Sequence, residues 1–239
     1  MVALAIFFGL KNKNKPVKKQ NKVVIVAALL IDGFELLKIG ILSYRGGDII
    51  KTVLHNLPLF FCSIMLIALP LAAFTSGRMK EAALDFVGMF GICAAVFGII
   101  GAGQNYNAYP TLGFDNVVSG ITHSLSGFGS LYVLITGMAK MRKRNIGITT
   151  GILAVFCLAA YIANVTIPYN YMFLMTPDGT PYTIFYNLVG GHHVIYPIVV
   201  IGLFVVYIAI FYAVFFLFAR KKQTIEVTLE DPTPQEALK

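Results

Sequence analysis

Long apolar runs, each about as long as a membrane-spanning helix, alternate with short polar segments along this chain. Such a helix needs about 20 apolar residues to cross the hydrocarbon layer of a bilayer. Only helices and closed barrels satisfy their backbone groups in lipid. The period-two alternation of a barrel strand is absent. Six runs predict full spans: Val23–Tyr44, Leu57–Phe74, Ala83–Gly103, Val117–Met138, Ile146–Pro168 and Val194–Ala219. The pattern predicts an all-α, polytopic transmembrane helical bundle.

The first apolar run, Val2–Leu10, is too short to span a bilayer by itself. Its lysines follow the run, whereas a signal peptide carries its positive charges before the apolar stretch. We therefore expect a short or truncated first helix, which brings the predicted total to seven helices. The predicted organisation is this helix with a basic cytoplasmic loop (1–22), a transmembrane bundle (23–219) and a disordered cytoplasmic tail (220–239).

Lysine and arginine concentrate in alternate connections. Basic clusters occur at 11–22, 78–80, 140–144 and 220–222, whereas the connections 104–116 and 169–193 contain neither residue type. The positive-inside rule then predicts a multi-pass protein of the cell membrane with its N-terminus outside and its C-terminus in the cytoplasm. Several residues of 169–193 are apolar, so we expect this connection to pack against the bundle as a partly buried cap.

Composition supports the membrane interpretation and limits the partners. The chain is 57% hydrophobic and 13% charged, whereas soluble domains carry about 25% charged residues. In this setting the net charge of +8 indicates topology and attraction to anionic lipid, so we expect phospholipid partners and no nucleic acid. The three cysteines lie in apolar runs, and no metal-ligand spacing is present, so we expect no disulfide framework, metal or cofactor. Nothing in the pattern specifies an oligomeric state.

Polar residues within the apolar runs are the candidate functional groups, because ionisable side chains are costly in lipid. Counting about 1.5 Å per helical residue places Cys62 and His123 at a similar depth, roughly 8 Å from the outer end of the bundle. Further polar residues near the same end are Asn164, Asn170, Tyr171, His192 and His193. Each also has a structural interpretation, as a packed thiol, an interhelical hydrogen bond or an interfacial residue.

A charged cluster lies deeper in the first full span. Asp32, Glu35 and Lys38 follow one another at spacings of three, which places Glu35 beside each of the others on the helix. The cluster predicts either a structural charge group facing the bundle interior or a proton or ion relay.

The pairing of Cys62 with His123 predicts nucleophilic chemistry. A thiol attacks an acyl carbonyl as thiolate, and a nearby imidazole can take its proton. A third polar group would orient the imidazole, and Asn164, Asn170 or Glu35 could do so. A site at this depth would lie near the ester carbonyls of phospholipids.

Four sequence elements carry a resemblance to a known family. They are Pro58-Leu59-Phe60-Phe61-Cys62-Ser63, the pair Glu35…Lys38, His123-Ser124-Leu125, and Asn164…Asn170-Tyr171-Met172-Phe173-Leu174…Pro177. In this order and spacing the chain resembles the YwaF-like bacterial integral membrane proteins, which are related to the transmembrane protein 164 acyltransferase family. The resemblance implies that Cys62 and His123 match the catalytic positions, with Asn164, Asn170, Tyr171, Glu35 and Lys38 as supporting polar residues.

Three functions are compatible with these features. The leading hypothesis is a membrane-embedded acyltransferase that moves a fatty acyl group between phospholipids through Cys62 and His123. The second is a lipid hydrolase that uses the same couple with water as acceptor. The third is a non-enzymatic transporter or lipid-binding membrane protein that uses the Asp32/Glu35/Lys38 cluster.

Overall fold

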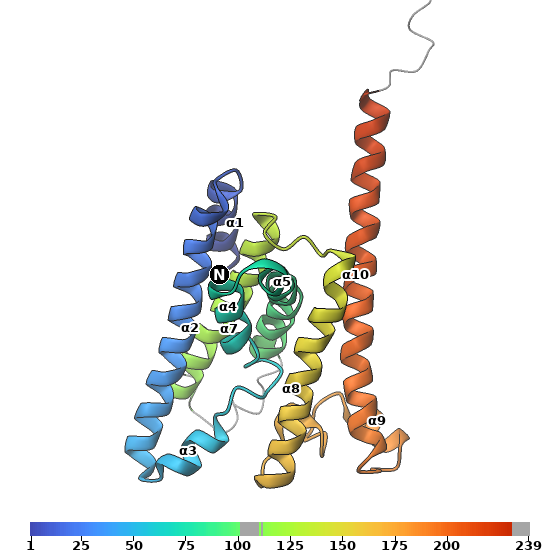
Figure 1. Ribbon diagram of the computed structural model, residues 1–239. Coiled ribbons are helices and arrows are strands. Elements are labelled where there is room, and N and C mark those ends of the chain that lie inside the picture. Colours follow the sequence, from blue (N-terminus) through green and yellow to red (C-terminus); the bar gives the residue numbers. More distant parts are fainter. Residues whose placement is uncertain (101–109, 111, 231–239) are drawn as a thin grey trace, which may run out of the picture.

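The computed structural model describes residues 1–100, 110 and 112–230, and these contain helices and no strand (Figure 1). The α-helices are α1 (Val2–Asn12), α2 (Val17–Gly46), α3 (Ile49–His55), α4 (Met65–Phe74), α5 (Gly77–Ile100), α7 (Phe114–Ile135), α8 (Ile146–Thr166), α9 (Thr183–Leu188) and α10 (Ile195–Glu230). Two short 3-10 helices are η1 (Lys143–Asn145) and η2 (Tyr171–Phe173). The predicted all-α class is confirmed.

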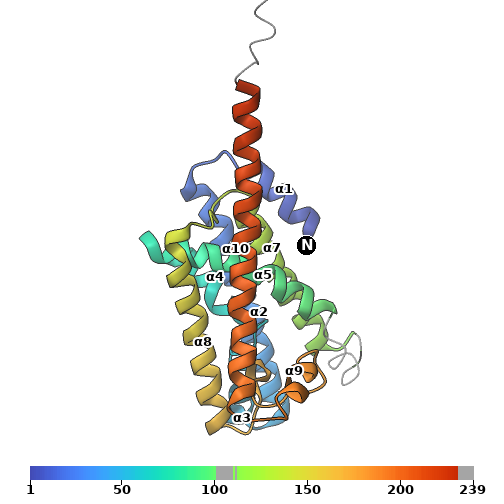
Figure 2. The same ribbon diagram turned by 90° about the vertical axis from the view of Figure 1, so that its right-hand side faces the viewer.

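Helix α5 forms the centre of the bundle. It packs against α4, α7 and α8, while α1 and α2 lie on one side and α10 on the other (Figure 1). In its most apolar stretch α5 is 67% buried, whereas α10 is only 22% buried in the corresponding stretch. Helix α10 packs on α8 and α9 and extends past the other helices (Figure 2).

Small residues bring α5 and α7 unusually close together. A β-carbon on Gly91 would lie 2.7 Å from the carbonyl oxygen of Ser126, a distance that real side chains do not tolerate. One turn away, the Ser130 hydroxyl donates a 2.7 Å hydrogen bond to the Gly88 carbonyl. Glycine at these positions allows backbone approach and an interhelical hydrogen bond, as is typical of membrane helices.

Four of the described helical segments are long and apolar enough to cross a membrane: Gly77–Ile99, Phe114–Ile135, Lys143–Thr166 and Ile195–Phe218. Helix α2 has 30 residues but carries Asp32, Glu35 and Lys38 in its middle. Helices α1 and α4 are apolar but have only 11 and 10 residues. The structure therefore supports a helical membrane protein, and the exact number of spans stays a prediction.

The predicted span Leu57–Phe74 is wrong over its first part. Residues 57–64 form consecutive turns, and α4 begins only at Met65. Pro58 lacks a backbone N–H, and the Phe60 carbonyl accepts from Ser63 and Ile64. The Phe60 ring packs on Tyr171, and the Phe61 ring stacks on Phe204. This apolar stretch is therefore held by aromatic packing and does not form a regular helix.

Three predicted basic connections meet at one end of the bundle, where Lys15, Lys80 and Lys140 line a common cavity. This agrees with the alternation expected from the sequence, while the orientation in a membrane stays a prediction. Helix α10 continues to Glu230, past the predicted helix end at Ala219. The rest of the predicted tail, the end of the predicted span Ala83–Gly103 and most of the connection 104–116 lie outside the described residues.

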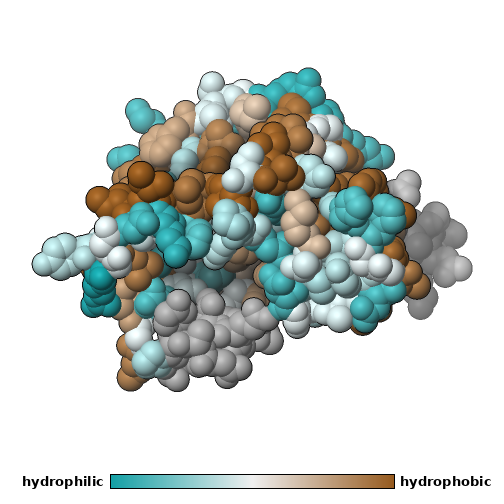
Figure 3. Space-filling model, turned by 90° about the horizontal axis from the view of Figure 1, so that it is seen from below, coloured by the Kyte–Doolittle hydropathy of each residue, from teal (hydrophilic) through white to brown (hydrophobic). Residues whose placement is uncertain are grey.

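The connection between α8 and α10 covers the opposite end, as predicted. It contains η2 and α9, and the side chains of Tyr171, Met172 and Leu174 are fully buried. Hydrophobic and hydrophilic residues are mixed on this end of the molecule (Figure 3). Such a mixture is typical of a surface at a membrane–water boundary.

Candidate functional site

A small cavity joins Cys62 and His123. Its volume is about 20 Å³, enough for one water molecule. Its walls come from α2, from the turns before α4, from α4 itself and from α7. The lining residues are Ile31, Glu35, Cys62, Ser63, Leu66, Thr122, His123 and Ser126.

Cys62 lies in the irregular segment just before α4 and is half-buried. Its sulfur is 3.9 Å from the Ser63 hydroxyl oxygen. The neighbouring phenylalanines pack against the buried core: Phe60 contacts Tyr171, and Phe61 contacts Phe90. These ring contacts hold the turns that present Cys62 to the cavity.

His123 is oriented by its own helix. Its Nδ1 lies 2.6 Å from the Ser119 carbonyl oxygen, one turn earlier in α7. Because a carbonyl only accepts hydrogen bonds, Nδ1 must carry the hydrogen, and in the neutral ring Nε2 is then a free acceptor. Nε2 is buried and has no hydrogen-bond partner among the described residues. The predicted orienting groups Asn164, Asn170 and Glu35 do not fill this role.

Cys62 and His123 face the same small cavity. Their geometry falls short of a formed hydrogen bond, since Nε2 has no partner. Catalytic hydrogen bonds are often long or misaligned in a ligand-free enzyme. The structure thus brings together the two residues that the sequence paired, without a closed hydrogen bond between them.

Gly98 on α5 is a site residue that the sequence did not single out. A β-carbon on Gly98 would lie 1.5 Å from Cδ2 and 2.0 Å from Nε2 of His123. The imidazole therefore occupies the space that any other residue at position 98 would fill. The Gly- and Ala-rich composition of this helix was the only signal in the sequence.

The charged cluster on α2 reaches the cavity through Glu35. Glu35 forms a 2.6 Å ion pair with Lys38, and both side chains are largely buried, Glu35 at 13% and Lys38 at 17% exposure. Lys38 also lies close enough to His123 for its charge to be felt there. Asp32 does not line the cavity and forms no ion pair among the described residues. The sequence pattern was therefore right about the pairing of Glu35 with Lys38.

Three predicted supporting residues hold the cap instead of lining the cavity. The Asn164 amide donates to the Tyr171 carbonyl at 2.9 Å and accepts from the Tyr171 N–H at 2.6 Å. The Asn170 amide donates to Thr176 and Asp178. The Tyr171 hydroxyl donates to the Leu54 carbonyl, and burial raises the pKa of this phenol, so it remains a donor. These residues connect the cap to α8 and α3.

The remaining polar candidates lie outside the cavity. His192 and His193 are exposed and stack on each other at the start of α10. Cys157 is buried against the sulfur of Met172, 3.9 Å away, and Cys93 contacts Tyr207. Within the described part of the chain, no group of three His, Cys, Asp or Glu residues could hold a metal ion.

The four long apolar segments among the described helices define a helical membrane protein. Its candidate site is the small cavity lined by Cys62 and His123. The family model described as the TMEM164 family matches residues 1–224 of this chain. The chain therefore belongs to the TMEM164 family, and its closer assignment to the YwaF-like proteins stays a prediction. No match was found among the curated proteins or among the solved structures.

Proposed function

We propose that this protein is a membrane-embedded acyltransferase that moves a fatty acyl group between phospholipids through Cys62 and His123. One observation carries the proposal. The hydrogen bond from Nδ1 to the Ser119 carbonyl leaves Nε2 as a buried acceptor without a partner among the described residues, and His123 lines the same cavity as Cys62. A buried, unsatisfied acceptor is costly, so its retention beside a nucleophile supports a role in proton transfer.

The first half of the reaction forms an acyl-enzyme. Nε2 of His123 takes the proton of the Cys62 thiol, and the thiolate attacks the ester carbonyl carbon of a donor phospholipid. The carbon–oxygen bond to the glycerol breaks, and the departing oxygen takes the proton back from Nε2. The products are an acyl-Cys62 thioester and a lysophospholipid.

The second half reverses these steps with another lysophospholipid. Its hydroxyl gives a proton to Nε2 while the oxygen attacks the thioester carbonyl carbon. The carbon–sulfur bond breaks, and the sulfur is reprotonated by the imidazolium. The overall reaction consumes one oxygen ester and forms another, so it needs neither an oxidant nor a nucleotide as a source of energy.

Hydrolysis is the second candidate, because water could take the place of the acceptor lipid in the second half of the reaction. A volume of about 20 Å³ admits one water molecule beside Cys62. With water in place of the lysophospholipid, the same steps release a free fatty acid.

The test is an assay in liposomes that contain a phospholipid with a labelled acyl chain and an unlabelled lysophospholipid. Acyl transfer is expected for the wild type and for Cys93→Ala, which removes a thiol outside the cavity, and not for Cys62→Ala. A hydroxylamine-sensitive acyl label should appear on Cys62 alone. Labelled free fatty acid as the main product would select the hydrolase instead. Full transfer by Cys62→Ala would overturn both enzymatic proposals.

Proton or ion flux across the same liposomes tests the transporter alternative. That function would depend on Glu35 and would not need the thiol. Loss of flux in Glu35→Gln together with normal flux in Cys62→Ala would favour the transporter.

A further inference from the structure

A second cavity opens at the basic end of the bundle, between the α1–α2 connection, the start of α5 and the connection after α7. Its volume is about 350 Å³, within the range of pockets that hold small ligands. The lining residues are Lys15, Val17, Gln20, Lys80, Glu81, Leu84, Asp85, Thr136, Gly137, Met138, Lys140, Arg142 and Asn145. Four of these side chains are basic and two are acidic, which gives the wall a net charge of +2.

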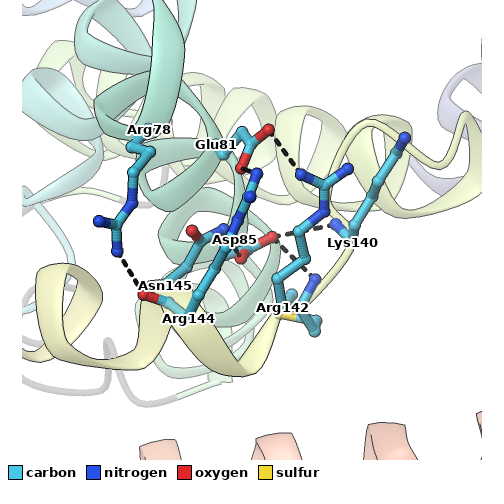
Figure 4. Close-up of polar contacts among 8 residues, drawn as sticks. Arg78, Glu81, Asp85, Lys140, Arg142, Arg144 and Asn145 are labelled. Carbon is cyan, nitrogen blue, oxygen red and sulfur yellow. Dashed lines mark hydrogen bonds and ion pairs between the residues drawn. The ribbon is translucent and has the colours of Figure 1, made fainter.

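The two carboxylates of this cavity are already engaged. The Glu81 oxygens pair with Arg142 and Arg144, each at 2.7 Å (Figure 4). Buried Asp85 accepts from the backbone N–H groups of Lys140 and Met141, and from the Asn145 amide. Among the described residues, neither carboxylate forms an ion pair with a lysine.

The positive charges of the lysines are by contrast uncompensated. The Lys80 ammonium donates to the neutral oxygens of Asn21, Ala72 and Ala73. Lys15 and Lys140 are exposed to the solvent, and neither forms an ion pair with an acidic side chain among the described residues. The cavity therefore offers two free ammonium groups to an anion.

Buried polar side chains fix the loops that carry these two lysines. The Gln20 amide, 6% exposed, donates to the carbonyls of Asn12 and Lys13 in the α1–α2 connection. Asp85, 1% exposed, holds the backbone of Lys140. A fixed backbone at each lysine reduces the entropy that is lost when an anion binds.

We propose that this cavity binds the phosphate of an anionic phospholipid headgroup, with Lys15 and Lys140 as the ligands. A phosphate supplies several acceptor oxygens for charge-assisted hydrogen bonds. Basic residues near the membrane surface attract anionic headgroups, and the attraction grows with each lysine. The apolar side chains of Leu84 and Met138 in the same wall suit the glycerol part of the headgroup.

The headgroup cavity is separate from the cavity of Cys62. Along α2, Gln20 of the first and Glu35 of the second are roughly 22 Å apart at 1.5 Å per residue. The ester carbonyls of a phospholipid lie only a few bonds from its phosphate. A lipid bound in the basic cavity therefore cannot present its own ester to Cys62, so this is a site for a second, non-reacting lipid.

The experiment measures lipid binding to the purified full-length protein by native mass spectrometry, with phosphatidylglycerol and with net-neutral phosphatidylcholine as probes. The variant Lys15→Ala/Lys140→Ala is compared with Lys18→Ala/Lys19→Ala, which removes the same charge outside the cavity. We expect a loss of phosphatidylglycerol affinity of roughly tenfold or more for the first variant and less than about threefold for the second. Lys15→Arg/Lys140→Arg should restore binding.

A parallel measurement distinguishes a lipid from a free phosphate. Inorganic phosphate is compared with chloride at equal ionic strength for its effect on the thermal unfolding of the wild type and the Lys15/Lys140 variant. Stabilisation by phosphate that needs both lysines, without selective retention of phosphatidylglycerol, would assign the site to a soluble phosphate compound and overturn the lipid assignment. Equal losses in both charge variants, or no loss in either, would overturn the site itself. None of these outcomes depends on Cys62 chemistry.

Discussion

Gly98 on α5 lies directly against the imidazole of His123 on α7. A β-carbon at position 98 would approach Cδ2 of the ring to 1.5 Å, so the ring and any larger residue cannot both occupy this space. The contact links the close packing of two helices to the position of the base in the proposed reaction. The absence of a side chain at position 98 of α5 is thus required for the position of His123 on α7.

Gly98→Ala should therefore displace His123 and reduce acyl transfer about 100-fold, the cost of a misplacement near 1 Å. Overpacking should also lower the free energy of unfolding by about 1–3 kcal/mol. The transfer assay in liposomes and a thermal unfolding curve measure the two effects. Gly33→Ala is the matched control, because an added β-carbon there meets no atom within 4 Å. Normal transfer by Gly98→Ala would show that the position of the ring does not matter.

Ser119→Ala tests which atom orients the imidazole. The hydroxyl lies 3.3 Å from Nδ1, whereas the carbonyl lies 2.6 Å away and remains after the substitution. We expect Ser119→Ala to retain at least about half of the transfer rate, because the stronger bond persists. His123→Asn should abolish transfer. If Ser119→Ala were as inactive as His123→Asn, the hydroxyl rather than the carbonyl would be the orienting group.

The ion pair between Glu35 and Lys38 should be strongly coupled. Each single change, Glu35→Gln or Lys38→Met, leaves one charge without its partner in a mostly buried position. We expect each to lower the free energy of unfolding by roughly 2 kcal/mol, and the double variant to recover most of this loss. Thermal unfolding in detergent measures all four proteins. Additive single effects would mean that the two side chains do not depend on each other.

Asn164 should stabilise the cap and take no part in the chemistry. Asn164→Leu removes two hydrogen bonds and leaves the Tyr171 N–H unpaired, while the Tyr171 carbonyl keeps only the Leu174 N–H as a donor. The expected loss is about 2–4 kcal/mol, with faster proteolysis of the connection 169–193 and little change in transfer per folded molecule. Thr166→Val, which removes a local hydrogen bond on the exposed end of α8, should leave proteolysis unchanged. Complete loss of transfer with an intact cap would instead place Asn164 in the reaction.

The positions of most helices follow from the sequence because each depends on a long apolar run and on the local preference for helix in lipid. The segment around Cys62 shows the limit of this reasoning. Residues 57–64 are as apolar as the membrane-spanning helices. Their aromatic rings, however, pack on Tyr171 and Phe204, which are distant in sequence. The depth assigned to Cys62 by helical counting therefore had the wrong basis, although the structure places Cys62 beside His123.

The orienting group of His123 could not be identified from the sequence at all. Every residue has a backbone carbonyl, so the bond from Nδ1 to Ser119 leaves no mark in residue type. The amides of Asn164 and Asn170 were attractive candidates because their side chains are polar and near the right end of the bundle. Their actual partners, Tyr171 and the 176–178 turn, depend on the path of a connection that hydropathy does not determine.

The volume of the Cys62 cavity has a kinetic consequence. A space that holds about one water molecule cannot accept a fatty acyl chain, so α2, α4 and α7 must separate before a lipid reaches the thiol. The surrounding bilayer then contributes to the activation barrier, because its lateral pressure opposes that separation. Turnover should consequently depend on the fluidity of the membrane, with a sharp decrease where the host lipids pass into the gel phase.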